Sequence, residues 1–383
     1  MRTGEIFTAS VERLAKGGAG ILHYQGKTVF MDKTAPGDTV VGRIQENRAG
    51  WARAELVEIT AAAPVRAAPA CPAYGRCGGC SLQHLSYEAQ AAEKSAALQE
   101  TLARIGGLTD LPELGVHLSP AFEYRNRLQF HRIPGGPAGT PAAGLKARAP
   151  GEAVPLEDCP VADPAIRRAL QEKTLAPPPE KERFTVYARG GAFLCEGGVS
   201  RGKVRLLDRE LLIDAGVFFQ SNAVMLEKVI LRLRELGETA GGSGSFADVY
   251  CGVGTFAAFL RDLFSQADLV EQDKAALGLA NENVPGRPVR RIALPAEAWL
   301  RNTPRLSYDF MVLDPPRRGL SPYTRRRLSQ DGPPLMAYLS CDPAALARDA
   351  REILRGGYTL AALDFYDFYP QTGHIESLAV FQR

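Results

Sequence analysis

Cys341 lies where a predicted strand meets a predicted helix. The strand is expected over residues 335–339, the motif Ser-Cys-Asp-Pro follows at 340–343, and a helix is expected over residues 344–354. A thiol just before a helix N-terminus lies at the positive end of the helix dipole, which favours the nucleophilic thiolate. Cys341 is therefore a candidate nucleophile, although the residue type alone is equally typical of a buried, inert cysteine.

A candidate general base follows near the end of the sequence. His374 and Glu376 are expected on one strand, and side chains two residues apart in a strand face the same side of the sheet. At such a position Glu376 can take a proton from a substrate held beside Cys341. By itself, either side chain is more often a solvated or hydrogen-bonded surface group.

The spacing of glycines and acids predicts a cofactor site at the edge of a parallel sheet. A buried strand over residues 245–250 leads into the glycine loop of residues 251–254, after which a helix begins. The next strand, residues 267–271, ends in Glu271, which can accept hydrogen bonds from both hydroxyls of a ribose. These features alone also fit a nicotinamide cofactor, and Glu271 alone also fits a solvated charge at a strand end.

A further strand, expected over residues 308–313, delivers Asp314 and two prolines to the edge where α/β sheets bind ligands. In methyltransferases a loop of this type usually faces the base or amine that is methylated. Thiolate addition at carbon 6 of uracil makes carbon 5 nucleophilic toward a methyl donor, and a base must then remove the carbon 5 proton. Cys341, Glu376, the glycine loop and Asp314 together can supply the parts that this reaction requires.

Four of the seven cysteines form a pattern typical of metal ligands. Cys71, Cys77 and Cys80 are closely spaced in a glycine- and proline-rich loop, and Cys159 follows far downstream, before a proline. Four thiolates can close a tetrahedral zinc site or hold an iron–sulfur cluster, and the spacing does not decide between the two. The distant fourth ligand joins two segments, so either metal group would be structural. The alternative is a set of unrelated cysteines.

Three regions of different character are expected along the chain. Short, evenly spaced strands with glycine turns predict a small β-barrel over residues 1–60. Residues 61–215 are expected to have α+β character and begin with an Ala/Pro-rich linker. This region contains the four cysteines, a predicted helix over 86–105 and a Gly/Pro-rich loop at 134–141. Strands and helices alternate over residues 216–383, so the fold class is α/β with a parallel sheet there.

The composition limits the class of protein. The 383 residues are 45% hydrophobic and 23% charged, as in ordinary globular domains, and a net charge of +3 permits nucleic-acid binding without requiring it. No apolar run is long enough for a membrane span, and the N-terminus lacks the order of a secretory signal. We therefore expect a cytoplasmic protein without membrane association. Because seven cysteines is an odd number, a disulfide framework is not expected.

The motifs occur in the order found in a known family. They are, in chain order, Phe218-Phe219-Gln220-Ser221-Asn222, Asp248 with Cys251-Gly252 and Gly254-Thr255-Phe256, Asp314-Pro315-Pro316-Arg317 with Gly319, Ser340-Cys341-Asp342-Pro343, and His374 with Glu376. With these motifs the chain resembles the RNA uracil-5-methyltransferase family, which implies a Rossmann-like S-adenosylmethionine methyltransferase domain at 216–383. Residues 1–60 are similar to the TRAM domain, an RNA-binding barrel.

The resemblance implies a role for each matching residue. Cys341 matches the nucleophile and Glu376 the base. The positions that match binding of S-adenosylmethionine are Gln220, Tyr250, Thr255, Glu271 and Asp314. The pattern of Cys71, Cys77, Cys80 and Cys159 resembles the 4Fe-4S cluster of the branch that modifies 23S rRNA, with zinc as the alternative.

Two positions depart from the family pattern. Thr255 stands where asparagine is also common in the family. Pro295 falls near the place where the family often has an acid or an amide directed at the adenine of the cofactor. Glu297 can substitute for that contact.

RNA is the predicted partner of a monomeric chain. Ribosomal RNA is favoured over tRNA, since the tRNA-specific branch typically lacks both the barrel and the cluster. The basic and aromatic segment 124–131 can contact phosphates and stack bases, and Arg325, Arg326 and Arg327 form a second basic patch, or simply a solvated helix face. The rival hypotheses are a non-catalytic RNA-binding protein and an iron–sulfur redox enzyme.

Overall fold

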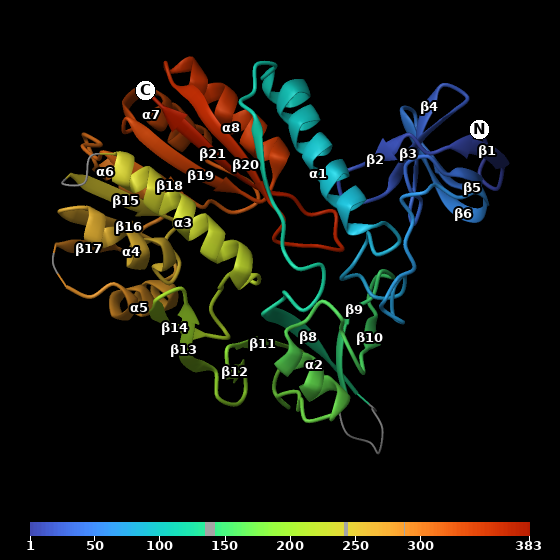
Figure 1. Ribbon diagram of the computed structural model, residues 1–383, viewed down its shortest axis with the longest axis horizontal. Coiled ribbons are helices and arrows are strands. Elements are labelled where there is room, and N and C mark those ends of the chain that lie inside the picture. The colour runs from blue at the N-terminus through green and yellow to red at the C-terminus, as the bar shows by residue number, and fades with distance from the viewer. Residues whose placement is uncertain (135–141, 241–243, 287) are drawn as a thin grey trace.

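The chain forms three β-sheets of five or more strands and a separate hairpin (Figure 1). The computed structural model describes residues 1–134, 142–240, 244–286 and 288–383. Apart from Pro134, the loop predicted at 134–141 therefore lies outside the described residues. Within them, no helix combines the length and the apolar character needed to cross a bilayer.

The first sheet is the predicted N-terminal unit of short strands. Its strands are, in spatial order, β1 (Ile6–Ser10), β5 (Thr39–Asn47), β6 (Trp51–Ala61), β4 (Lys27–Met31), β3 (Gly20–Tyr24) and β2 (Arg13–Leu14). The predicted hairpin is confirmed, because β3 and β4 pair antiparallel with Tyr24 opposite Lys27. Alternate side chains of these strands, among them Leu22 and Val29, form a small core of their own.

The second sheet carries the middle of the chain. It is antiparallel, in the order β10 (Ala153–Pro155), β9 (Ala142–Lys146), β8 (Arg127–Ile133), β11 (Arg183–Arg189) and β12 (Ala192–Cys195). Helix α2 (Pro164–Gln171) packs on β11. The hairpin of β13 (Arg201–Leu206) and β14 (Arg209–Asp214) then leads into the C-terminal region.

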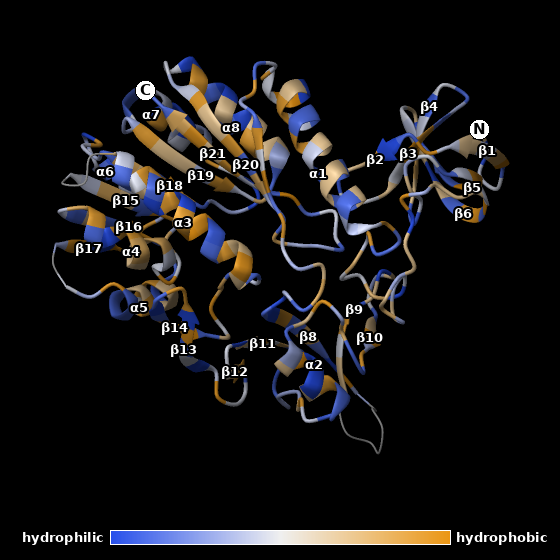
Figure 2. Cartoon of the chain, viewed as in Figure 1, coloured by the Kyte–Doolittle hydropathy of each residue, from blue (hydrophilic) through white to orange (hydrophobic). Residues whose placement is uncertain are grey.

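The third sheet is the parallel α/β sheet that the sequence predicts, with an antiparallel addition. Its order is β17 (Val289–Ile292), β16 (Gln266–Val270), β15 (Ser245–Val249), β18 (Phe310–Leu313), β19 (Leu335–Ser340), β21 (Glu376–Gln382), β20 (Thr359–Tyr366) and β7 (Leu114–His117). The first five strands are mutually parallel, whereas β21 runs antiparallel to both of its neighbours. Hydrophobic residues follow one another along β19 and β21, as expected for strands covered on both faces (Figure 2).

Helices connect and cover the strands of this sheet. They are α3 (Ala223–Thr239), α4 (Thr255–Leu260) with the 3₁₀ turn Arg261–Leu263, α5 (Lys274–Asn283), α6 (Ala296–Asn302), α7 (Pro322–Asp331) and α8 (Pro343–Arg355). Two of them begin at side-chain caps next to the predicted site. Asp273 accepts hydrogen bonds from the first turn of α5, and Asp342 does the same for α8, satisfying amides that a helix start leaves free.

The segment from α1 to β7 packs with the C-terminal unit, although it lies within residues 61–215. Helix α1 (Tyr87–Thr101), which continues into a π-helical turn at Leu102–Gly106, contacts α8, and β7 pairs in parallel with β20. Figure 1 shows α1 between the large sheet and the N-terminal sheet. The division of the chain into three parts remains a proposal. Within the middle part, α1 and β7 pack with the third sheet, whereas β8 to β12 form the second sheet.

The segment predicted as a linker after the first sheet is packed against its neighbours. Ala63 is buried in a cluster with Leu82, and the Arg66 guanidinium donates to Asp38 at 2.6 Å. Asp38 is fully buried and also accepts the amide hydrogens of Ala35 and Ala63. This one carboxylate therefore holds the segment against the barrel.

A buried ion pair ties α1 to the chain that leads into β21. The Lys94 ammonium donates to Asp367 at 2.8 Å and to the carbonyl of Tyr369 at 2.9 Å, and the two charged side chains are 3% and 0% exposed. The backbone of Gln371 is held in turn by Gln90 of α1, at 2.8 Å. Helix α1 thus fixes the path of residues 367–371.

Replacing Lys94 with methionine should destabilise the protein strongly. The change leaves Asp367 buried without its partner, which costs about 3–5 kcal/mol in such pairs. The matched control is Arg43→Met, since Arg43 faces Glu55 across 3.8 Å with both side chains half exposed, and such pairs contribute at most about 1 kcal/mol. Urea unfolding of the two variants measures the difference. Equal midpoints would show that the Lys94 pair does not hold this region together.

Candidate active site

A cavity of about 490 Å³ lies at the carboxyl ends of the parallel strands. All seven residues predicted for catalysis and cofactor binding line it. They are Gln220, Tyr250, Thr255, Glu271, Asp314, Cys341 and Glu376. The loops that follow β15, β16, β18 and β19 each supply at least one of them, as expected of ligand sites in α/β sheets.

Cys341 and Glu376 are brought together by strand pairing. Cys341 directly follows β19, and Glu376 is the first residue of β21. The register places Ser340 opposite Ser377, so the end of one strand meets the beginning of the other. Although 35 positions separate them in the chain numbering, the two side chains therefore share one cavity.

His374 does not lie on the strand with Glu376, and the prediction that it does is wrong. Strand β21 begins only at Glu376, because Gly373 pairs instead with Gly17 of the N-terminal sheet. His374 nevertheless lines the same cavity as Glu376. Its ring packs edge to face on Tyr369, with 5.6 Å between the ring centroids.

The glycine loop after β15 is shaped for close approach of a ligand. Tyr250 has a positive φ of 67°, which is uncommon for a residue with a side chain and marks local strain beside the cavity. Gly254 has φ 78°, and a Cβ there would lie 3.0 Å from Ala280 of α5. The Glu271 carboxylate accepts the amide hydrogen of Gly252 at 3.1 Å, which ties the loop to the end of β16.

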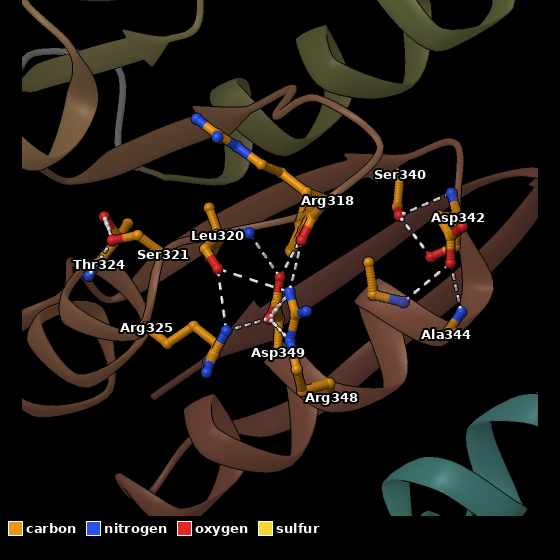
Figure 3. A network of polar contacts seen from close by, with 12 residues as sticks. Arg318, Leu320, Ser321, Thr324, Arg325, Ser340, Asp342, Ala344, Arg348 and Asp349 are labelled. Atoms are coloured by element: carbon orange, nitrogen blue, oxygen red, sulfur yellow. Dashed lines mark hydrogen bonds and ion pairs between the residues drawn. The ribbon is translucent and has the colours of Figure 1, made fainter.

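The loop that carries Asp314 is anchored to α8 through Asp349. The buried Asp349 carboxylate accepts the Leu320 amide at 2.8 Å and the Tyr338 hydroxyl at 2.8 Å (Figure 3). It also pairs with Arg325 of α7 at 3.3 Å and with the neighbouring Arg348. One carboxylate thus joins the loop after β18, strand β19 and helix α8, and the sequence motifs gave no sign of it.

The Cys341 thiol is not activated in the way that the helix position predicts. Burial raises its pKa to about 12, and the carboxyl groups of Glu376 and Asp314 act in the same direction. The guanidinium of Arg317 opposes them. Burial and the nearby carboxyl groups therefore favour the protonated thiol over the thiolate.

The carboxyl groups of the cavity share this environment. Burial raises the pKa of Asp314 to about 7, with Glu271 acting in the same direction, although a hydrogen bond from Gln220 at 3.3 Å lowers it. Burial and Asp314 raise the pKa of Glu376 well above its ordinary value. Burial and Arg317 lower the pKa of His374 to about 4, so its ring is neutral. Several acidic groups thus share one cavity and hold one another's pKa values up, so a cationic ligand there would favour their charged forms.

The four predicted metal-binding cysteines line a second cavity, of about 710 Å³. Burial raises the pKa of Cys159 to about 12 and also raises those of Cys77 and Cys80. The Gly79 amide donates to the Cys77 sulfur at 3.3 Å. Among the described residues, no three cysteine, histidine or acidic side chains lie close enough to hold a single metal ion.

The two basic segments are largely structural. Tyr124 and Phe130 are buried in the core of the second sheet, so the prediction that this segment's aromatic rings stack on bases is wrong for both. Arg325 donates to the carbonyl of Leu320, and Arg327 donates to the carbonyl of Pro304 at 2.7 Å.

Arg317 is a site residue to which the sequence gave no separate role. It lines the cavity of Cys341 and Glu376 and also a smaller, adjoining cavity that Cys341 and His374 line as well. Its place within the Asp-Pro-Pro-Arg motif was the signal that could have identified it.

Comparison with known proteins places the chain among methyltransferases. The TRAM domain family model matches residues 2–57. A Treponema denticola protein named an uncharacterized RNA methyltransferase is 31% identical, over 94% of this chain and 94% of the relative. The 23S rRNA (uracil(1939)-C(5))-methyltransferase RlmD of Chromohalobacter salexigens is 29% identical, over 98% of this chain and 89% of the relative.

A solved structure has the same architecture. The Pyrococcus abyssi tRNA (uracil-54, C5)-methyltransferase, in complex with S-adenosyl-L-homocysteine, superposes with a TM-score of 0.74. It is 22% identical and covers 98% of this chain and 100% of its own. This likeness supports the order and packing of all three sheets.

Alkylation of Cys341 should report its raised pKa. Only the thiolate reacts, so its iodoacetamide rate should rise about tenfold per pH unit from pH 7 to 10 without a plateau. Glu376→Gln removes a negative neighbour, lowers the pKa of Cys341 and should accelerate the reaction at pH 9. Peptide mass spectrometry measures both rates.

The control for this experiment is Glu352→Gln, on the partly exposed face of α8 near Arg355. It should leave the rate unchanged. A plateau below pH 8 in the unaltered protein would instead mean that the helix dipole dominates.

Proposed function

The chain belongs to the RNA uracil-5-methyltransferase family, and from this we propose that it methylates carbon 5 of a uridine in 23S rRNA with S-adenosylmethionine as donor. It is an RNA (uracil-5-)-methyltransferase. The observation that carries the mechanism is that Cys341, Glu376 and the five predicted cofactor residues line one cavity.

In the proposed reaction Cys341 is the nucleophile. The thiol first gives its proton to solvent. The thiolate sulfur then adds to carbon 6 of the uracil, and the electron pair of the carbon 5–carbon 6 double bond moves toward carbon 4 to form an enolate. Carbon 5 then takes the methyl group, which S-adenosylmethionine supplies as an electrophilic sulfonium. Because the target base must reach a buried thiol, the uridine leaves its stack.

Glu376 is the proposed base. Its carboxylate removes the proton from carbon 5, the double bond re-forms, and the bond between carbon 6 and sulfur breaks to release Cys341. Asp314 and Gln220, which are joined by a hydrogen bond, are placed to hold the polar end of the donor or of the base. The pKa of Asp314, raised by burial to about 7, makes the cavity receptive to a positive charge at and above neutral pH.

The remaining cofactor residues define where the donor binds. Glu271 is proposed to accept the ribose hydroxyls, with Tyr250 and Thr255 beside the glycine loop. A neighbouring cavity of about 160 Å³ is lined by Tyr250, Glu271, Pro295 and Glu297. We place the adenine there, and Glu297, which is 39% exposed and pairs with Arg301 at 2.8 Å, is the proposed substitute for the acid that Pro295 lacks.

The cysteine cavity is proposed to hold a 4Fe-4S cluster, with zinc as the alternative. Four free thiols line one space, and an amide hydrogen already points at the Cys77 sulfur, as in sites where backbone amides stabilise thiolate ligands. Cys159 is distant in sequence from the loop that carries Cys71, Cys77 and Cys80, so the group would join two segments of the chain. Its proposed role is structural.

Ribosomal RNA remains the proposed substrate and tRNA the second candidate. Relatives named 23S rRNA methyltransferases support the first. The N-terminal sheet does not distinguish rRNA from tRNA as the substrate, since the solved tRNA methyltransferase structure aligns with 98% of this chain. The cytoplasmic location and the monomeric state stay predictions.

Tritium release tests the reaction. Purified protein with S-adenosylmethionine should release tritium from 23S rRNA transcripts that carry 5-tritiated uridine. Cys341→Ala should abolish release, because no enolate can form. Glu376→Gln should slow release by about 10²–10⁴-fold and accumulate an RNA–protein adduct that survives a denaturing gel.

Each alternative predicts a different result. Release from tRNA but not from rRNA transcripts would change the substrate. No release from either RNA would favour the binding-protein or redox hypothesis. If Glu376→Gln turns over at the unaltered rate, the base must be another residue, with His374 the nearest alternative in the cavity.

Metal analysis tests the cysteine site. Protein purified without oxygen should contain about four iron atoms and matching sulfide per chain, and Cys159→Ala should lose them. Cys195→Ala is the matched control, because Cys195 packs on the same core without lining the cavity, and it should keep the iron. About one zinc per chain and no iron would identify the alternative.

A further inference from the structure

The N-terminal sheet reaches the catalytic loops through the turn between β2 and β3. Gly17 pairs with Gly373, one residue before His374, and a Cβ at Gly373 would lie 2.5 Å from the Gly17 backbone. The side chain beside this contact, Lys16, forms an ion pair with Asp342, the residue after Cys341. The barrel therefore touches both loops that carry the proposed nucleophile and base.

Lys16 is part of a cavity that the proposed reaction has not used. This cavity, of about 300 Å³, is bounded by Lys16, Arg317, Cys341, Asp342 and His374. Arg317, Cys341 and His374 also line the larger cavity, so the two spaces meet at the thiol. None of the five predicted cofactor residues lines the smaller cavity, which adds the Lys16 cation to that of Arg317 beside the thiol.

The geometry of a pyrimidine nucleotide indicates which chemical group should occupy the smaller cavity. In the usual anti conformation, the carbon 6 edge of the base faces the 5′ oxygen of its own ribose. A thiol that attacks carbon 6 is therefore on the side of the 5′ phosphate. The cations of the smaller cavity, beside the thiol, therefore lie where that phosphate is expected.

We propose that Lys16 binds the phosphate on the 5′ side of the target uridine, and that Asp342 holds the ammonium in place for it. This inference rests on the proposed function, since it needs a uridine at Cys341. It assigns to the barrel a direct part in positioning the reacting nucleotide, in addition to general RNA binding.

The existing contacts leave Lys16 able to do this. An ammonium has three N–H donors, and Asp342 accepts one of them. The Lys16 side chain is 61% exposed, whereas Asp342 is 20% exposed. The other carboxylate oxygen of Asp342 accepts the amides of Ala344 and Ala345 at 2.9 and 3.0 Å, which fixes its direction (Figure 3).

The charges around the cavity favour a phosphate over other groups. Asp342 is the one acid among the residues that line it, and Lys16 and the cap of α8 already engage both of its oxygens. Arg317 supplies a second cation from the opposite loop. A contact of this kind positions the nucleotide without reading its base.

The test is a double-mutant cycle on a synthetic RNA that spans the methylated uridine, found by mass mapping of the 23S rRNA product. Methylphosphonate replaces the phosphate 5′ of that uridine and removes its charge. Lys16→Met should raise the KM for the unmodified RNA about tenfold, as expected for loss of one charge-assisted contact, and leave the affinity for S-adenosylmethionine unchanged. The methylphosphonate should cost the unaltered protein at least the same factor, and should cost Lys16→Met less, because the contact of Lys16 with the phosphate is already lost.

Two variants separate this role from a merely structural one. Arg13→Met removes another ion pair between the N-terminal sheet and the rest of the chain, to Glu100 at 3.0 Å, and should keep full sensitivity to the methylphosphonate. Lys16→Arg should restore most of the lost affinity. The proposal would be overturned if the methylphosphonate raised the KM of Lys16→Met by the same factor as that of the unaltered protein. It would also be overturned if Arg13→Met were as insensitive to the methylphosphonate as Lys16→Met. An unaltered protein that methylates no RNA would instead refute the proposed function, and the inference with it.

Discussion

The antiparallel pairing of β21 with β19 is the constraint on which the site depends. In a purely parallel sheet, every strand would present its carboxyl end to the ligand, and a residue that begins a strand would lie at the opposite edge. Because β21 runs the other way, its first residue, Glu376, lies beside Cys341. A slip of one residue in the pairing would turn Glu376 to the other face of the sheet. Both strands are buried almost throughout, so the hydrophobic core holds this register.

The pairing also explains the polar contacts that surround the chain before β21. Residues 367–375 connect the end of β20 to the start of β21 at this same edge of the sheet without regular structure, and buried backbone groups there need partners. Gln90 and Lys94 of α1 supply them, and the Tyr124 hydroxyl donates to the carbonyl of Pro370 at 2.8 Å. Helix α1 and the segment before β8 thus hold the residues that lead to the proposed base.

Much of this could be predicted from the sequence, and the limit has a physical cause. Strand-to-loop transitions such as the one before Asp314 depend on local patterns of apolar residues, glycine and proline, so their positions were found to within two residues. The position of His374 was missed because a contact with Gly17, distant in sequence, ends the strand early. The protonated state of Cys341 was missed for a similar reason, since it depends on carboxyl groups that only the folded sheet assembles.

The contact between Gly17 and Gly373 has a consequence for how RNA is presented. Both residues meet through their backbones, and a side chain at Gly373 would collide with the backbone of Gly17. Such a contact sets the distance between the N-terminal sheet and the catalytic loops more firmly than two flexible side chains would, because the backbone has few alternative positions. The Ser81 hydroxyl, which accepts the Gly373 amide at 3.1 Å, and the packing of Gly18 on Ser81 and Leu82 add to it. RNA held by the barrel is therefore held at a fixed offset from Cys341, and the cysteine-bearing segment that contains Ser81 is part of what fixes that offset.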